Sequence, residues 1–312
     1  MSTRQKINDI LQRHIIVADA AVGTALIGTR RDLCADELSI TAPERVVALH
    51  EAAIRAGARI ITTNTFLSDS LSLVASGATH TTEKVVAKSV AAAKQARESV
   101  AKEATAAGKT PREVFIAGSI GPSVRNISLA TDISEEALRE SYRALIKALT
   151  AEGVDIFLIE SITDIRNAEI AAEECRSIAP ETPIIFSAVL SKIGGLLLSG
   201  RTIEKYVEDV EKFDPLAIGF NCSTGVQSVV DNLSLLVRYT KRPTYCSPSA
   251  GIPDAKGDYP ESVKRHTETL RKAAESGLLS IVGGCCGTTE KHTLGVAQMA
   301  RHYKPRKTEQ DE

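Results

Sequence analysis

The amino-acid sequence predicts a single (β/α)₈ barrel, an α/β fold whose site lies at the C-terminal ends of the strands. From residue 15 onward, short β-branched apolar runs alternate with longer segments of helical periodicity, which favours parallel pairing of the strands. Eight such units fill most of the 312 residues, as a closed barrel requires. Runs such as VDIFLIE at 154–160 are apolar on both faces, as strands covered by helices are.

The elements are expected in strict alternation. The predicted strands are, in order, Ile15–Asp19, Arg59–Thr63, Val114–Ser119, Val154–Glu160, Pro183–Val189, Pro215–Asn221, Pro243–Ser247 and Leu278–Gly283. The predicted helices between them include Thr82–Ala107, Ser134–Glu152, Thr202–Lys212 and Tyr259–Glu275.

Capping and turn residues support these boundaries. Ser134 followed by two glutamates is a good helix N-terminus, because it combines a capping hydroxyl with negative charge at the positive end of the helix dipole. Four glycines stand where helices should end, namely Gly57, Gly108, Gly153 and Gly277. Three prolines stand where strands should start, namely Pro183, Pro215 and Pro243.

A doubly wound open sheet is the structural alternative. That fold needs a phosphate-binding turn with three glycines after the first strand, whereas DAAVGT at 19–24 contains one. No low-complexity linker interrupts the chain. We therefore expect one barrel over residues 1–303, followed by a frayed polar tail at 304–312.

The composition excludes several classes of protein. The formal net charge is −1 and aromatic residues make up 4% of the chain, so nothing indicates a nucleic-acid or anionic-membrane partner. Residues 1–14 are polar and lack the apolar core of a signal peptide, and no later stretch is long enough to span a bilayer. Six cysteines in a chain of this length indicate reduced thiols, as in the cytoplasm.

The most informative stretch is LSIVGGCCGTT at 279–289, in which two adjacent cysteines follow a short apolar strand. Neighbouring strand residues point to opposite faces, so Cys285 and Cys286 can meet only if the backbone turns. Gly283, Gly284 and Gly287 are expected to allow that turn through their backbone freedom. Two thiolates together favour a soft metal, most simply zinc. The alternative is a strand end with two buried, apolar cysteines.

Cys222 strengthens the metal interpretation. It follows the strand LAIGFN at 216–221 and should stand at the same mouth of the barrel as the cysteine pair. Three protein ligands with an open fourth position are typical of catalytic zinc. Cys246 precedes the polar end of its strand, and its side chain is expected to face the other way. Cys34 and Cys175 are interpreted as structural or incidental.

Polar residues stand at the C-terminal ends of almost all the predicted strands. They are Asp19, Thr63, Asn64, Ser119, Glu160, Ser187, Asn221 and Ser247. Asp19 or Asn64 could simply cap the following turn. Glu160 ends a strongly apolar strand, and its carboxylate is either a solvated rim charge or the partner of a substrate cation. An open zinc held by three thiolates favours a substrate thiol, which becomes a nucleophilic thiolate on coordination. The hypothesis is alkylation of a thiol, with a carboxylate and amides nearby that could hold an amino-acid head group.

At this point the motifs resemble a known family. They run over nearly the whole chain as Asp19-Ala-Ala-Val-Gly-Thr24, Thr63-Asn-Thr-Phe66, Gly118-Ser-Ile-Gly-Pro122, Leu158-Ile-Glu-Ser161, Gly219-Phe-Asn-Cys222 and Gly283-Gly-Cys-Cys-Gly-Thr288. The chain is similar to the homocysteine S-methyltransferases, which include the homocysteine-binding domain of cobalamin-dependent methionine synthase and betaine–homocysteine methyltransferase. The resemblance implies a zinc-dependent TIM barrel that methylates homocysteine to methionine, with the zinc-bound thiolate as the nucleophile.

The resemblance also implies roles for residues. Three cysteines would be the Zn²⁺ ligands, namely Cys222, Cys285 and Cys286. Asp19 and Glu160 would hold the substrate ammonium. Backbone and side chains around four residues would meet its carboxylate, namely Ala20, Thr63, Asn64 and Ser119.

Departures from the family pattern concern the pocket and the donor. The family usually has glycine where this chain has Ala20, and its methionine-synthase branch has asparagine where this chain has Ser249. The methyl donor stays open among betaine-type, sulfonium and methylcorrinoid compounds. The alternative hypothesis is a subunit of a complex with a separate corrinoid protein, acting on a different thiol or donor.

Overall fold

The computed structural model describes residues 1–28, 30, 33–192 and 194–308. Within them, eight parallel strands form one sheet in the order β1-β8-β7-β6-β5-β4-β3-β2. The strands are β1 (Ile16–Val17), β2 (Ile60–Thr62), β3 (Phe115–Ile120), β4 (Ile156–Ile162), β5 (Ile184–Ala188), β6 (Ala217–Cys222), β7 (Thr244–Pro248) and β8 (Ile281–Val282). All eight predicted strands are present, several of them shorter than expected.

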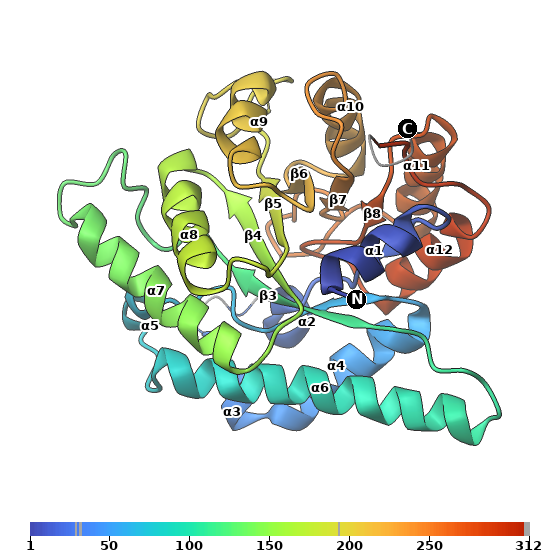
Figure 1. Ribbon diagram of the computed structural model, residues 1–312, viewed down its shortest axis with the longest axis horizontal. Coiled ribbons are helices and arrows are strands. Elements are labelled where there is room, and N and C mark those ends of the chain that lie inside the picture. Colours follow the sequence, from blue (N-terminus) through green and yellow to red (C-terminus); the bar gives the residue numbers. More distant parts are fainter. Residues whose placement is uncertain (29, 31–32, 193, 309–312) are drawn as a thin grey trace.

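The sheet closes on itself between β1 and β2. An isolated parallel bridge joins Ala18 to Ile60, and the backbone N–H of Asp19 donates to Ile60 O over 3.0 Å. Figure 1 shows the helices arranged around the strands. The predicted (β/α)₈ barrel is therefore confirmed, and the open doubly wound sheet is excluded.

Helices connect and cover the strands. They are α1 (Thr3–Leu11), α2 (Gly23–Ile27), α3 (Leu38–Thr41), α4 (Pro43–Ala56), α5 (Ser70–Ala75), α6 (Thr82–Ala106), α7 (Glu135–Ala151), α8 (Ile165–Ile178), α9 (Ile203–Glu211), α10 (Val226–Leu236), α11 (Val263–Glu275) and α12 (Glu290–Ala300). Of the helices in the described part of the chain, none is both long and apolar enough to cross a bilayer.

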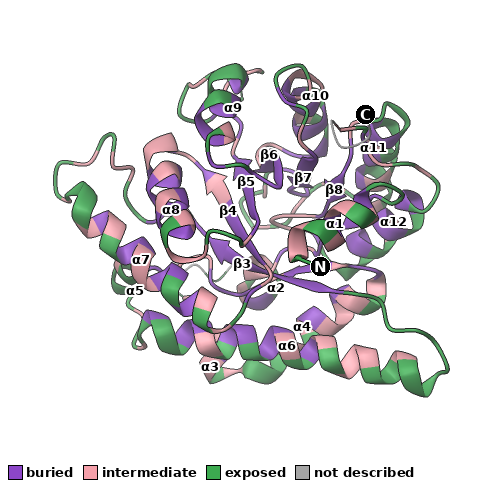
Figure 2. Ribbon diagram, in the orientation of Figure 1, coloured by how far each residue is buried: buried purple, intermediate pink, exposed green. Residues whose placement is uncertain are grey.

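The core has two layers, because alternate residues of each strand face inward and outward. Inward-facing residues such as Ile16 and Tyr245 fill the barrel, and Ile7 and Leu11 of α1 pack into the same inner cluster. Outward-facing residues such as Val17 belong to the larger layer between sheet and helices. Figure 2 shows the strands buried and the outer faces of the helices exposed.

Most boundary predictions are confirmed. Ser134 caps α7 and accepts a hydrogen bond from Ala137 N over 3.2 Å. The four glycines predicted at helix ends all have positive φ, namely Gly57, Gly108, Gly153 and Gly277. The prediction of a helix from Tyr259 is wrong. Helix α11 begins at Val263, because Ser262 caps it and accepts from Arg265 N. Residues 259–262 belong instead to the loop that follows β7.

The expectation of a frayed tail is wrong at Arg306. Its backbone N–H donates to Leu279 O over 2.8 Å, and its buried guanidinium donates to Thr240 O over 2.7 Å and to Arg242 O. The segment therefore packs against residues that precede β7 and β8. Residues 309–312 of the predicted tail lie outside the described residues.

Candidate active site

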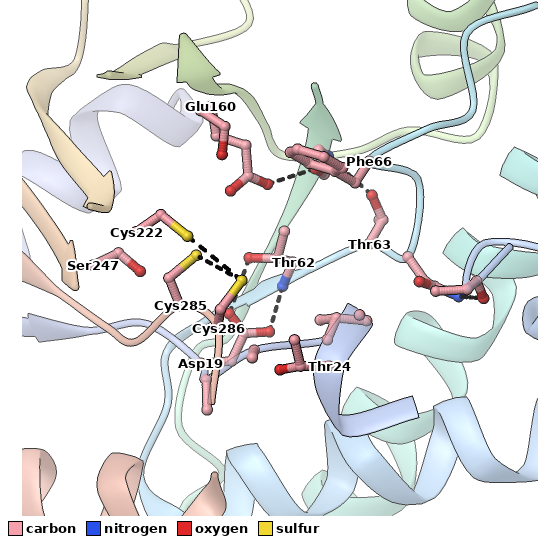
Figure 3. Close-up of a pocket in the computed structure, with 18 of the residues that line it drawn as sticks. Asp19, Thr24, Thr62, Thr63, Phe66, Glu160, Cys222, Ser247, Cys285 and Cys286 are labelled. Carbon is pink, nitrogen blue, oxygen red and sulfur yellow. Dashed lines mark hydrogen bonds between the residues drawn. The ribbon is translucent and has the colours of Figure 1, made fainter. Parts of the chain in front are cut away.

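A pocket of about 330 Å³ opens at the C-terminal ends of the strands. It is lined by every residue predicted for the site, namely Asp19, Ala20, Thr63, Asn64, Ser119, Glu160, Cys222, Cys285 and Cys286. Figure 3 shows the three cysteines on one side of this space, with Glu160 and Asp19 directed toward it from β4 and from the loop after β1. Apolar side chains, among them Ile27, Phe66 and Leu67, complete the wall.

The three predicted metal ligands lie together. Cys222 Sγ is 3.5 Å from Cys286 Sγ, and Cys285 Sγ is 4.0 Å from Cys286 Sγ. All three sulfur atoms lie within 4.8 Å of one another, and in the described part of the chain this is the one such group of three or more His, Cys, Asp or Glu residues. Residues 63 positions apart in the sequence thus converge because β6 and β8 both flank β7 in the barrel.

The backbone turns where the cysteines require it. Cys222 has φ of +54° at the end of β6, a left-handed conformation that costs about 1–3 kcal/mol for a residue with a side chain. Cys285 N donates to Pro248 O over 2.9 Å, and Cys286 O accepts from Ala250 N over 2.9 Å. These bonds to the end of β7 fix the cysteine pair to the barrel rim.

The glycines around the pair act in two different ways. Gly287 has φ of +78°, as predicted. Gly283 and Gly284 do not have positive φ, so for them the expected reason is wrong. They are needed for space, because a Cβ at Gly283 would lie 2.8 Å from Asp19 O and one at Gly284 would lie 2.4 Å from Thr288 Oγ1. Gly283 therefore lets the loop approach the Asp19 segment closely, and Gly284 lets the loop fold tightly against its own Thr288.

The cluster fits a tetrahedral zinc. Sulfur atoms bound to one zinc at about 2.3 Å in tetrahedral geometry are about 3.8 Å apart. The two contacts of 3.5 and 4.0 Å bracket that spacing. The three thiols also line the pocket, so a fourth position would face the space available to a substrate.

Two thiol contacts converge on the sulfur of Cys286. The thiols of Cys222 and Cys285 donate to its sulfur, which lowers the pKa of Cys286 and raises the pKa of the two donors. Tyr259 lies beside the cluster, and burial together with the negative charge of Cys286 raises the pKa of Tyr259 to about 12. Sequence reasoning missed Tyr259, because it placed this residue inside a helix.

Asp19 is held by the neighbouring strand. Its Oδ2 accepts from the backbone N–H of Thr62 over 2.7 Å, and its Oδ1 accepts from Thr62 Oγ1 over 2.9 Å. Burial raises the pKa of the Asp19 carboxyl to about 7 despite these two bonds. A buried carboxyl with a raised pKa is poised to ionise when a cation enters. Thr62 was not predicted as a site residue, although it directly precedes the predicted pair Thr63 and Asn64.

Glu160 stands across the pocket from Asp19. Ser119 Oγ donates to Glu160 Oε1 over 2.5 Å. Burial raises the pKa of Glu160 to about 7, with smaller contributions from the negative charges of Cys286 and Asp36. Asp36 is a third carboxyl on this wall and was also missed. Burial raises its pKa to about 7, and its Oδ2 accepts from Leu67 N over 2.7 Å.

The other predicted residues differ in how free their polar atoms are. Thr63 Oγ1 shares a hydrogen bond with Thr65 Oγ1 and accepts from Ser119 N over 3.0 Å. The Asn64 amide nitrogen donates to Ala35 O over 2.7 Å and to Ser39 Oγ, so it fixes the long loop after β1. Ala20 lines the pocket, as the resemblance implied.

The remaining cysteines lie away from the pocket. Cys246 belongs to the outward-facing core layer, as predicted, and burial raises its pKa to about 12. Cys175 is buried in α8, and Cys34 is partly buried in the loop after β1. Ser249, at the position of the family's asparagine, donates to Ser223 O over 3.3 Å.

Comparison with known proteins decides the family. The chain matches the homocysteine S-methyltransferase family over residues 16–300. It belongs to that family. By family the protein is thus an S-methyltransferase of the homocysteine S-methyltransferase type.

Solved structures with the same fold are forms of the homocysteine methyltransferase MmuM from Escherichia coli. The metallated form is 22% identical with a TM-score of 0.78, and the match covers 95% of this chain and 99% of that one. The oxidized form is 20% identical with a TM-score of 0.78, covering 96% and 99%. The apo form is 23% identical with a TM-score of 0.70, covering 92% and 97%. At these identities the likeness establishes the fold.

Proposed function

We propose that this protein transfers a methyl group to the sulfur of homocysteine and so forms methionine, with Zn²⁺ held by Cys222, Cys285 and Cys286. The observation that carries the proposal is the convergence of three thiols at the rim of a pocket that also holds buried carboxyls. Family membership supports homocysteine as the acceptor. When bound there, zinc would lower the pKa of a substrate thiol so that it is a thiolate at neutral pH.

The pocket suits the head group of an amino acid. Asp19 and Glu160 become ionised when they face an ammonium group, because the cation offsets the burial that raises their pKa. Thr62 and Ser119 keep these two carboxylates in place through the bonds described above. We infer that the substrate carboxylate lies near Ala20, Thr63, Asn64 and Ser119.

The transfer itself is a displacement. The substrate thiolate gives an electron pair to the methyl carbon, and the bond from that carbon to the donor heteroatom breaks and leaves its pair on the donor. The protein aligns the two reactants and keeps the sulfur near the cluster. The apolar wall with Phe66 and Leu67 excludes water from the transfer space.

A cationic donor suits this pocket best. Among the described residues that line it, Asp19, Asp36 and Glu160 are acidic, and none is lysine, arginine or histidine. The positively charged nitrogen or sulfur of a betaine-type or sulfonium donor would be attracted, and this atom becomes neutral when it gives up the methyl group. A methylcorrinoid carried by a separate protein is the second candidate, and full activity of the isolated chain with small donors would exclude it.

The experiment is a donor screen. Purified protein with zinc is incubated with homocysteine and, in separate reactions, glycine betaine, S-methylmethionine or methylcobalamin, and methionine is measured. Methionine formed with at least one donor supports the proposal. No bound metal together with no methionine from any donor refutes it. Three closely spaced reduced thiols also need a reducing compartment, which supports a cytoplasmic location.

A further inference from the structure

The side chain of Asn221 connects two halves of the pocket. Asn221 is fully buried at the end of β6, directly before Cys222. Its Oδ1 accepts from the backbone N–H of Ser161 over 2.9 Å and from Ser187 Oγ over 2.8 Å. Its Nδ2 donates to Ser161 Oγ over 2.8 Å and points at Cys285 Sγ over 3.7 Å. The two acceptor sites and two donor hydrogens of the amide are therefore all used.

The orientation of this amide is fixed by chemistry. A backbone N–H can only donate, so the amide atom facing Ser161 N must be the oxygen. The nitrogen is then the atom that faces Cys285. A flipped amide would set two donors against each other at Ser161 and an oxygen against the sulfur.

On one side the amide holds a strained segment of β4. Ser161 has φ of +56°, and the register between β4 and β5 shifts between Ile159 and Ile162. This irregularity directly follows Glu160 and sets the direction in which its carboxylate leaves the strand. Asn221 binds both the N–H and the hydroxyl of Ser161, so it clamps the segment that aims Glu160.

On the other side the amide donates to a predicted metal ligand. When Cys285 binds a metal it would do so as a thiolate, and an N–H directed at its sulfur would then stabilise the negative charge and fix the direction of the lone pairs. Within the described residues, the Asn221 amide is the one side chain outside the cysteine cluster that donates a hydrogen bond to the Cys285 sulfur. Loss of the donor should therefore weaken metal binding without removing a ligand.

We propose that Asn221 is a positioning residue whose amide oxygen sets Glu160 through Ser161 and whose amide nitrogen sets Cys285. The proposal rests on the proposed function, which assigns Glu160 to the substrate ammonium and Cys285 to the metal. The oxygen and the nitrogen of one side chain thus serve two separate functions, namely recognition of the substrate ammonium and binding of the metal.

Asn221→Asp separates the two halves. The carboxylate keeps an acceptor for the Ser161 N–H and the Ser187 hydroxyl, but it places an oxygen against Cys285. We expect the zinc affinity, measured by competition with a chromophoric chelator, to fall about tenfold or more. We expect the Kd of norvaline, which has the homocysteine head group and no thiol, to stay close to the wild-type value. Asn221→Ala should weaken both zinc and norvaline binding.

Ser187→Ala is the matched control. It removes one bond to the same Oδ1 and touches neither Ser161 nor Cys285, so both affinities should stay near wild type. Wild-type zinc affinity in Asn221→Asp, or wild-type affinity for both ligands in Asn221→Ala, overturns the inference. If neither variant folds, Ser161→Ala decides. Its norvaline Kd should rise about threefold with unchanged zinc affinity, and an unchanged Kd overturns the inference. Wild-type protein that binds neither zinc nor norvaline would instead overturn the proposed function.

Discussion

Replacing Glu160 by glutamine should raise the free energy of unfolding of the substrate-free protein at pH 8 while weakening substrate binding. The carboxyl is buried in the pocket and its pKa rises to about 7. A carboxyl whose pKa is raised on folding stabilises the fold below its unfolded pKa, and this stability is lost as the pH rises through the folded pKa. From its ordinary value to about 7, the loss at pH 8 is roughly 3–4 kcal/mol. Glutamine avoids this loss and can still accept from the Ser119 hydroxyl.

The kinetic effect has the opposite sign. At pH 8 the ionised Glu160 would make a charged hydrogen bond to the substrate ammonium, which is worth about 1.5–3 kcal/mol. Its loss should raise the KM for homocysteine by about 10- to 100-fold. Urea unfolding of the substrate-free protein at pH 5 and pH 8, together with steady-state kinetics at pH 8, checks both effects.

The control for this variant is Glu204→Gln, which removes an exposed carboxylate in the first turn of α9, outside the pocket. It should leave the KM for homocysteine and the pH dependence of stability unchanged. A KM for Glu160→Gln within twofold of wild type, with no gain in stability at pH 8, would refute the assignment of Glu160 to the ammonium.

Three further predictions concern the pocket and its rim. Gly287→Ala should lower the free energy of unfolding, measured in urea, by at least about 2 kcal/mol more than Gly77→Ala. Both glycines have positive φ, but only at Gly287 would a Cβ meet the Tyr259 ring, 2.1 Å from its Cγ. Equal losses in the two variants would contradict the packing described. Thr62→Val should raise the KM for homocysteine about 3- to 10-fold, because Asp19 loses its hydroxyl donor while the backbone N–H remains; an unchanged KM would remove Asp19 from substrate binding. The KM for homocysteine should fall at least about tenfold from pH 6 to pH 8, because the buried carboxyls with pKa near 7 must ionise to hold the ammonium; a flat profile in steady-state kinetics would count against ionisation on binding.

The fold was predictable because its signals are local and repeated. Apolar runs of strand length, capping residues such as Ser134 and terminal glycines such as Gly153 each depend on neighbouring residues only. The convergence of Cys222 with the cysteine pair followed from the fold, since every parallel strand of a barrel ends at the same rim. Sequence reasoning could therefore name the cysteine cluster before any geometry was known.

The contacts around the cluster were not predictable in the same way. Tyr259 lies in an irregular loop just before α11. The helical periodicity of the sequence continues into this loop, so the predicted helix began four residues too early. Ser161 has a left-handed backbone conformation, which a serine in the sequence does not predict. Asn221 was recognised only as a polar residue at the end of a strand. Gly283 serves close packing against the segment of Ala18 and Asp19, which depends on three-dimensional proximity and not on local backbone freedom.

The central claim is tested most directly by the metal content of the purified protein. Wild-type protein should hold about one zinc per chain after dialysis, measured by elemental analysis, and Cys222→Ser should hold close to none while keeping its far-ultraviolet circular dichroism. Cys34→Ser, which removes a thiol outside the cluster, should retain the zinc. Wild-type protein without bound zinc, or Cys222→Ser with undiminished zinc, would contradict the three-thiol site on which the account depends.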